Sequence, residues 1–239
     1  MATSSSTDFV VTESNIISDA LAKLGVIAVG ASPTAGETTH ARRALNMMCK
    51  QWSSPSNGLV WGFKAWQREE LALTLTAAIS FEIYESASAA LNDTAPIAIL
   101  SAMLRDTNGN ESPLSWMTIQ EFQAIPNKSS TGTPQRYTYE RLVLNSKGVL
   151  YLDIIPSDTT DVLDLLVLRE IEDFDAANNN PDFPKEWSRA LVWNLALELA
   201  EDYGKDPRRY ENKAREAINL ANSFNPQRYT GHFEPDREL

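Results

Sequence analysis

The segment from Pro181 to Gly204 constrains the fold most, because its start, interior and end all predict one helix. Pro184 lies in the expected first turn, where a missing N–H costs no hydrogen bond, and Gly204 can adopt the left-handed conformation that ends helices. Apolar residues cover most of the circumference between them: Trp187, Ala190, Leu191, Trp193, Leu195, Ala196, Leu197, Leu199 and Ala200. Such a helix must be buried, so we expect the rest of the chain to surround it.

Three further segments have apolar residues at helical spacing. The first runs from Thr12, a possible cap, to Gly25. The second, 34–52, opens with a Thr-x-x-Glu capping box. The third, 206–221, opens with Asp-Pro, a common start for a helix. Two helix pairs are therefore expected, one in each half of the chain.

Between the two helix pairs, the apolar period changes from about four residues to two, which indicates strands. The pattern predicts a hairpin of 71–76 with 81–84 and a second one of 96–104 with 112–116. Thr118 can cap a short helix, and further strands are expected at 137–139, 149–155 and 162–168. The middle of the chain is therefore predicted to be β-rich.

These patterns predict an α+β fold, in which a bundle of about four helices carries an inserted antiparallel β-sandwich or barrel-like unit. We expect an N-terminal arm and first helix pair over residues 1–65 and the β-rich unit over 66–170. A linker and second helix pair follow over 171–225. The tail, 226–239, has no period and contains Gly231 and Pro235, which predicts an extended C-terminal arm.

The sequence contains no phosphate-binding loop, nucleophile elbow or paired-cysteine motif. One cysteine, Cys49, and two histidines, His40 and His232, argue against a conventional zinc site, so we expect no metal and no cofactor. Met48 and Cys49, at helical spacing, are interpreted as core residues together with Met47. The catalytic alternatives are therefore limited to carboxylates.

Two groups of acids, Glu69–Glu70 and Glu198 with Glu201 and Asp202, leave open a carboxylate-dependent cell-wall hydrolase. Acid pairs that cleave glycosides normally face each other across a cleft, whereas neighbouring acids on one helix usually form a solvated face. We therefore expect no catalytic residue and no enzyme activity. An oligomeric binding scaffold unrelated to viruses is a third possibility.

The formal net charge of −11 argues against a protein that grips nucleic acid over a basic face. No run of about eighteen apolar residues is present, and the polar N-terminus does not resemble a signal peptide. We therefore expect a chain made in the cytoplasm without a membrane anchor.

Several segments, in their order and spacing, resemble one family, the podovirus head-to-tail adaptors, also described as head-completion, packaged-DNA-stabilisation or tubular tail proteins. The most specific combination is EFQAIPNKSSTGTP followed by FPKEWSRALVWNLALELAEDYG. The segments that carry the resemblance are Ile16–Gly25, Thr34–Trp52, Met117–Pro134, Phe183–Gly204 and Ala214–Ala221.

The resemblance implies a dodecameric ring at the head–tail junction of the virion. This ring would bind the portal protein, help to retain the packaged double-stranded DNA and provide the platform for the tail nozzle protein. The DNA would pass through the acidic channel without specific binding. The expected portal-binding residues lie in the C-terminal arm, which offers aromatic and aliphatic anchors with charged neighbours: Arg228, Tyr229, Phe233, Arg237 and Leu239. The alternatives for this arm are docking on an adjacent subunit and a tail without a role.

Overall fold

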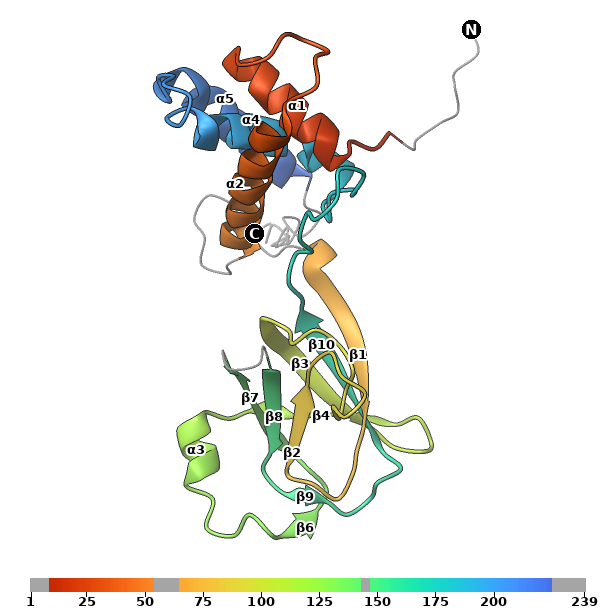
Figure 1. Cartoon of the computed structure of the whole chain (residues 1–239). Coiled ribbons are helices and arrows are strands. Elements are labelled where there is room, and N and C mark those ends of the chain that lie inside the picture. The colour runs from red at the N-terminus through yellow and green to blue at the C-terminus, as the bar shows by residue number, and fades with distance from the viewer. Residues whose placement is uncertain (1–8, 54–64, 143–146, 225–239) are drawn as a thin grey trace, which may run out of the picture. The chain divides into compact units, whose positions relative to one another are not determined.

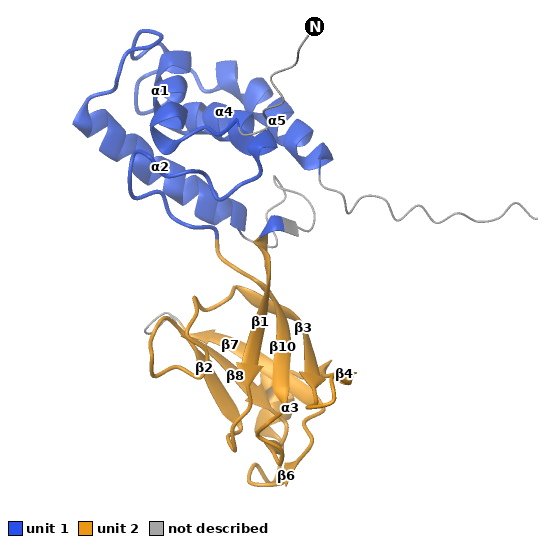
Figure 2. Cartoon of the chain, turned by 90° about the vertical axis from the view of Figure 1, so that its right-hand side faces the viewer, with its two compact units in different colours: residues 1–66, 171–239 blue, residues 67–170 orange. Residues whose placement is uncertain are grey.

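The computed structural model describes residues 9–53, 65–142 and 147–224. The chain divides into two compact units, coloured separately in Figure 2. One unit consists of Met1–Trp66 and Ile171–Leu239, and the other is the continuous segment Gln67–Glu170. The fold is α+β: the first unit contains the long helices and the second contains the strands.

The helical unit contains α1 (Glu13–Leu24), α2 (Ala35–Ser53), α4 (Ser188–Leu199) and α5 (Arg208–Ser223) (Figure 1). The predicted ends of α1 are confirmed, because Thr12 is its N-cap and Gly25, at φ 69°, its left-handed C-cap. Thr34 and Glu37 form the predicted capping box before α2, with the Thr34 N–H donating to the Glu37 carboxylate at 2.7 Å. This bond lowers the pKa of Glu37, because it stabilises the charged carboxylate.

The predicted helix over 181–204 is shorter than expected. It begins with a 3-10 turn at Lys185–Trp187 and continues as α4 only to Leu199. Pro184 is extended, with ψ at 146°, so it precedes the helix and does not form its first turn. After Leu199 the chain follows tight turns, with Ala200 N–H bonded to the Leu197 carbonyl, until Gly204 adopts the left-handed conformation.

All four helices contribute to one hydrophobic core. It contains Ile16, Ile17 and Leu21 of α1, Leu45 and Trp52 of α2, Leu191, Leu195 and Leu199 of α4, and Ile218 of α5. Trp187 is almost fully buried, and its ring centroid lies 5.8 Å from Trp52 and 5.1 Å from Trp66. The predicted burial of Met48 and Cys49 is confirmed, whereas Met47 is 60% exposed, because it lies on the opposite side of α2.

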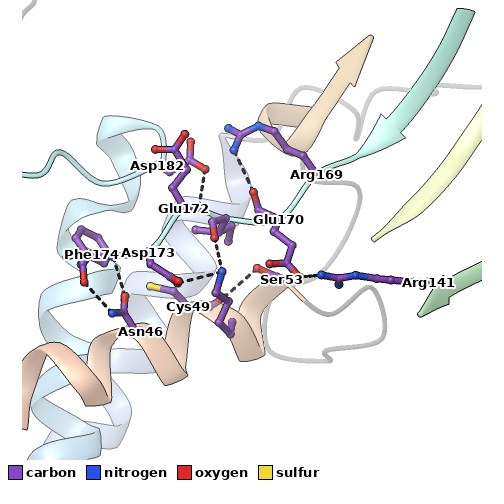
Figure 3. A network of polar contacts seen from close by, with 12 residues as sticks. Asn46, Cys49, Ser53, Arg141, Arg169, Glu170, Glu172, Asp173, Phe174 and Asp182 are labelled. Carbon is purple, nitrogen blue, oxygen red and sulfur yellow. Dashed lines mark hydrogen bonds and ion pairs between the residues drawn. The ribbon is translucent and has the colours of Figure 1, made fainter. Parts of the chain in front are cut away.

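The segment that begins at Ile171 is held against α2 by polar contacts (Figure 3), and it also contacts the start of α1. The Asn46 side chain accepts from the Phe174 N–H at 2.9 Å and donates to the Phe174 carbonyl at 2.8 Å. Lys50 donates to the Ile171 carbonyl and pairs with Asp173 at 3.0 Å. The N-terminal Glu13 N–H of α1 donates to the Asn179 carbonyl, so this segment also satisfies a helix end.

The β unit contains two four-stranded sheets and one two-stranded sheet. The first sheet has the order β1-β10-β3-β4, and all its pairs are antiparallel. The second has the order β2-β8-β7-β5, with β5 parallel to β7. The strands of the two large sheets are β1 (Arg68–Thr74), β2 (Ser80–Ile83), β3 (Ala98–Arg105), β4 (Glu111–Pro113), β5 (Ser115–Trp116), β7 (Arg136–Leu142), β8 (Lys147–Leu152) and β10 (Val162–Leu168).

The two four-stranded sheets share one core, with residues from both: Leu71, Leu73, Phe81, Ile83, Ala102, Leu104, Tyr137, Leu150, Leu152, Leu163, Leu165 and Val167. A closed barrel is not formed by the described strands, because each sheet ends in two different strands. The hairpin expected between 71–76 and 81–84 is also wrong: β1 pairs with β10, and β2 pairs with β8. The intervening residues carry the chain from one sheet to the other, and both strands still turn apolar side chains towards the shared core.

The shorter elements follow their local signals. The predicted hairpin of 96–104 with 112–116 is confirmed in part: β3 pairs with β4, with Arg105 opposite Glu111, but Ser115–Trp116 form β5 and pair with β7 of the other sheet. Thr118 caps α3 (Ile119–Gln123) through a capping box with Glu121. The small sheet pairs β6 (Thr131–Gly132) with β9 (Ile155–Pro156). Within the described ranges, no helix is both long and apolar enough to cross a membrane.

Candidate interaction surface

The predicted portal-binding residues all lie outside the described part of the chain, which ends at Phe224. The assignment of these residues to portal binding therefore stays a prediction. They are Arg228, Tyr229, Phe233, Arg237 and Leu239.

The outer face of the sheet β1-β10-β3-β4 is the best-defined candidate surface among the described residues. Alternation turns Leu71, Leu73 and Leu165 into the core, so their neighbours in sequence point outward. The register places outward residues side by side in three rows across the sheet. These rows are Glu70–Leu166–Ser101, Ala72–Asp164–Met103–Pro113 and Thr74–Val162–Arg105–Glu111.

An ion pair organises the middle of this face. Arg105 Nε donates to one Asp164 oxygen at 2.7 Å, and its terminal nitrogen donates to the other oxygen at 2.9 Å. This two-pronged bond, with the nearby charge of Glu111, raises the pKa of Arg105. Both oxygens of Asp164 are thus hydrogen-bonded to Arg105. The other two acids on the outer face, Glu70 and Glu111, form no ion pair with another described residue.

The same face is hollowed. A depression of about 570 Å³ is lined by acids, one arginine and apolar side chains: Glu70, Leu71, Ala72, Ser101, Met103, Arg105, Glu111, Asp164, Leu165 and Leu166. Met103, one of the lining residues, is 38% exposed. A lining of apolar side chains and acids fits a peptide with apolar and cationic side chains better than it fits nucleic acid.

One border of this face is an unpaired strand edge. Leu75 N–H donates to the Asp161 carbonyl and Arg169 N–H to the Gln67 carbonyl, so the odd-numbered residues of β1 bond to β10. The even-numbered Glu70, Ala72 and Thr74 therefore direct their N–H and C=O groups away from the sheet. These groups bond to no described residue, and the three side chains are exposed. Within the part of the chain that the structure describes, the edge of β1 is thus unpaired over most of its length.

The carboxylates of the hydrolase alternative are not arranged as facing pairs. Glu69 and Glu70 are neighbours on β1, so their side chains point to opposite faces of the sheet. Asp202 is bonded to His40 at 2.9 Å, and both side chains are about half exposed. Glu198 and Glu201 are exposed at the end of α4. Glu198, Glu201 and Asp202 are thus solvated, whereas Glu70 lines the hollow of the outer face together with Glu111 and Asp164.

The described ranges contain no group of three or more His, Cys, Asp or Glu side chains placed to hold a metal ion. Cys49 is buried in the helical core, and burial raises the pKa of its thiol to about 12. The thiol therefore stays protonated at neutral pH and reacts slowly.

The outer-face residues were not predicted from the sequence. Alternation in 98–105 and 162–168 already places Met103, Arg105 and Asp164 on one side of their strands. It does not say that β3 and β10 are neighbours, and without that pairing the ion pair and the hollow cannot be inferred.

Comparison of the chain with models of known families and with curated proteins finds no match.

Proposed function

We propose that this chain is a structural virion protein, a head-to-tail adaptor. In this proposal, twelve copies form a ring at the head–tail junction that binds the portal protein and helps to retain packaged DNA. The ring also provides the attachment platform for the tail nozzle protein. It needs no cofactor and no catalytic residue.

The observation that carries the proposal is the packing of the segments that resemble the adaptor family. Ile16–Gly25, Thr34–Trp52, Phe183–Gly204 and Ala214–Ala221 are far apart in sequence, yet each contributes to the same hydrophobic core. Met117–Pro134 contains the capped helix α3. The resemblance therefore concerns the residues that build the fold, as expected if chain and family share an architecture.

We interpret this architecture as a four-helix bundle with an inserted β-sandwich and an extended C-terminal arm. The interpretation rests on the single core of the helices and on the single core shared by the two four-stranded sheets. Two units with separate cores suit a ring protein, because one can contact the portal and the other the next component of the tail.

The acidity of the chain supports a passive role towards DNA. A net charge of −11 repels phosphate, and a repulsive channel wall lets DNA pass without holding it. In this proposal the DNA is retained because the ring and the tail close the channel, and no base or backbone contact is needed.

The proposal is tested by mixing the purified chain with purified portal rings and measuring the mass of the complex. Twelve copies per portal ring are expected, and a chain truncated after Pro226 should stay folded but fail to bind. Binding by the truncated chain at the same stoichiometry would show that the arm residues, Arg228 to Leu239, do not carry the contact. Absence of any complex with the full chain would refute the adaptor proposal.

The hydrolase alternative is tested with the Glu198→Gln variant. Because Glu198 is an exposed residue at the end of α4, the adaptor proposal expects unchanged folding and portal binding. If the full chain clears peptidoglycan and Glu198→Gln abolishes that activity with an unchanged melting curve, the adaptor proposal is replaced by the hydrolase.

A further inference from the structure

Among the described residues, the edge of β1 offers unpaired N–H and C=O groups to a partner that can form backbone hydrogen bonds. Sheet edges attract extended chains, and proteins usually protect them with proline, bulges or a covering segment. Two other outer strands are short or partly covered: β4 has three residues and ends in Pro113, and the Glu82 carbonyl of β2 accepts from the Leu91 N–H. Glu70 to Thr74 contains no proline, and β1 pairs with β10 without a bulge. This edge is therefore suited to the addition of a strand.

The chain itself carries a segment with the matching pattern. The tail as a whole has no period, but residues 228–233, Arg-Tyr-Thr-Gly-His-Phe, alternate between polar and apolar or small side chains. Arg228, Thr230 and His232 share one side of an extended chain, and Tyr229 and Phe233 share the other. Alternation of this kind is typical of a strand with one buried and one exposed face.

We propose that residues 227–233 of one copy pair as an added strand with the outer edge of β1 in an adjacent copy, with Thr230 opposite Ala72. The inference rests on the proposed function, because a ring supplies the adjacent copy. It also narrows that function. The first half of the arm, with Arg228, Tyr229 and Phe233, joins neighbouring subunits instead of the portal, and Arg237 and Leu239 remain as the expected portal contacts.

Charge and polarity agree with this pairing in either strand direction. Ala72 points to the outer face of the sheet, so the polar side chains of the added strand would also lie on that face. Its aromatic side chains would lie on the opposite face, next to the core residues Leu71 and Leu73. With Thr230 opposite Ala72, a parallel strand places Arg228 next to Glu70, and an antiparallel strand places His232 there. Glu70 forms no ion pair within the described structure, so it is available to a cationic neighbour.

A disulfide trap tests both the position and the adjacent copy. Directly opposite residues of paired strands have Cα atoms about 4.5–5.5 Å apart, which is within the range that a disulfide spans. One full-length chain carries Ala72→Cys, the other carries Thr230→Cys, and they are mixed with oxidised glutathione. Cys49 does not interfere, because it is 1% exposed. The control pair replaces Ala72→Cys by Thr131→Cys, an exposed position in β6 of the same unit.

The proposal expects the mixed disulfide to form about tenfold faster than in the control pair, because pairing raises the local concentration of the two thiols. Equal rates would overturn it. A chain with both substitutions that forms only an internal disulfide, while the mixed chains form none, would overturn the assignment to an adjacent copy.

A proline at Ala72 tests the backbone contact. The Ala72 N–H points away from β10, so Ala72→Pro removes it without breaking a bond of the sheet, and Ala72→Thr is the matched control that keeps it. A labelled peptide of residues 225–239 is titrated into each full-length variant and followed by fluorescence anisotropy. Binding to Ala72→Pro should be about tenfold weaker than to Ala72→Thr, at unchanged melting temperature. Equal binding to the two variants would refute strand addition.

The two proposals can fail separately. A mixed disulfide without any portal complex would refute the adaptor function and leave the strand pairing intact. A twelve-copy portal complex without the disulfide would leave the adaptor function and refute the pairing.

Discussion

Gly148 is a position where one added carbon should have a large effect on the β unit. In β8, Gly148 lies opposite Arg141 of β7, and the ring of Tyr139 covers it. A Cβ at this position would overlap the hydroxyl and the adjoining ring carbons of Tyr139. The Tyr139 hydroxyl donates to the Pro96 carbonyl at 2.7 Å, so the ring cannot move away without breaking this bond.

The expected cost of Gly148→Ala has two parts. Loss of the hydrogen bond costs about 0.5–1.5 kcal/mol, and forcing an extra carbon into packed surroundings costs about 1–3 kcal/mol. We expect a destabilisation of about 2–4 kcal/mol, which for a unit of this size lowers the melting temperature by on the order of 10 °C. This is opposite in sign to the effect of replacing glycine in an ordinary strand, where alanine stabilises by about 0.5–1 kcal/mol.

The assay is urea unfolding of the full chain, with hydrogen exchange of residues 136–152 as the local measurement. Tyr139→Leu serves as the second mutation of a double-mutant cycle, because leucine lacks the hydroxyl and the outer ring. In the Tyr139→Leu background, Gly148→Ala should be nearly neutral or stabilising. The same cost in both backgrounds would refute the overlap as its cause, and a stabilising Gly148→Ala in the natural chain would refute the packing described for Tyr139.

Three other substitutions or conditions follow from the structure. Leu195→Ala removes a fully buried side chain from the helical core and should cost about 2–5 kcal/mol, measured by urea unfolding; a midpoint equal to that of the natural chain would show that α4 is not central. Arg42→Met removes the 2.7 Å partner of the buried Glu13, whose other oxygen has no partner among the described residues, and should cost about 3 kcal/mol. Adding Glu13→Gln should recover most of this loss, and no recovery would exclude the stranded carboxylate as its cause. Burial raises the pKa of Tyr139 to about 12, above its unfolded value of about 10, so its contribution to stability is complete below pH 10 and decreases as the pH rises towards 12. Tyr139→Phe should flatten this decrease in denaturation midpoints measured between pH 9 and 12, and an identical decrease would assign it to other groups.

The ends of helices were predictable because the signals that set them are local. Thr12, Thr34 and Thr118 each cap the helix that follows, and Gly25 ends α1. A capping side chain reaches only two or three residues along the chain, so a short stretch of sequence contains both partners.

The strand partners were not predictable in the same way. Alternation showed which side of β1 and β2 is apolar, but either strand could satisfy that pattern with many partners. The pairing of Leu73 with Leu163 joins residues distant in sequence, and it depends on the packing of both sheets against one core. The outer face, the Arg105–Asp164 pair and the open edge all follow from this pairing, so the sequence alone could not reveal them.

The short link at the base of the β unit has a consequence for how the helical unit folds. Arg169 N–H donates to the Gln67 carbonyl at 2.8 Å, so the unit begins and ends at one point. In the unfolded chain, residues 67–170 form a long flexible loop between the two halves of the helical unit. Once the β unit has folded, the ends of this segment are fixed close together, so the effective loop is only a few residues long. Shortening a loop from about a hundred residues to about three reduces the entropy of closure by about 3 kcal/mol. The folded β unit therefore acts on the helices as a cross-link, and a weakened β unit should loosen the helical core through the chain that joins them.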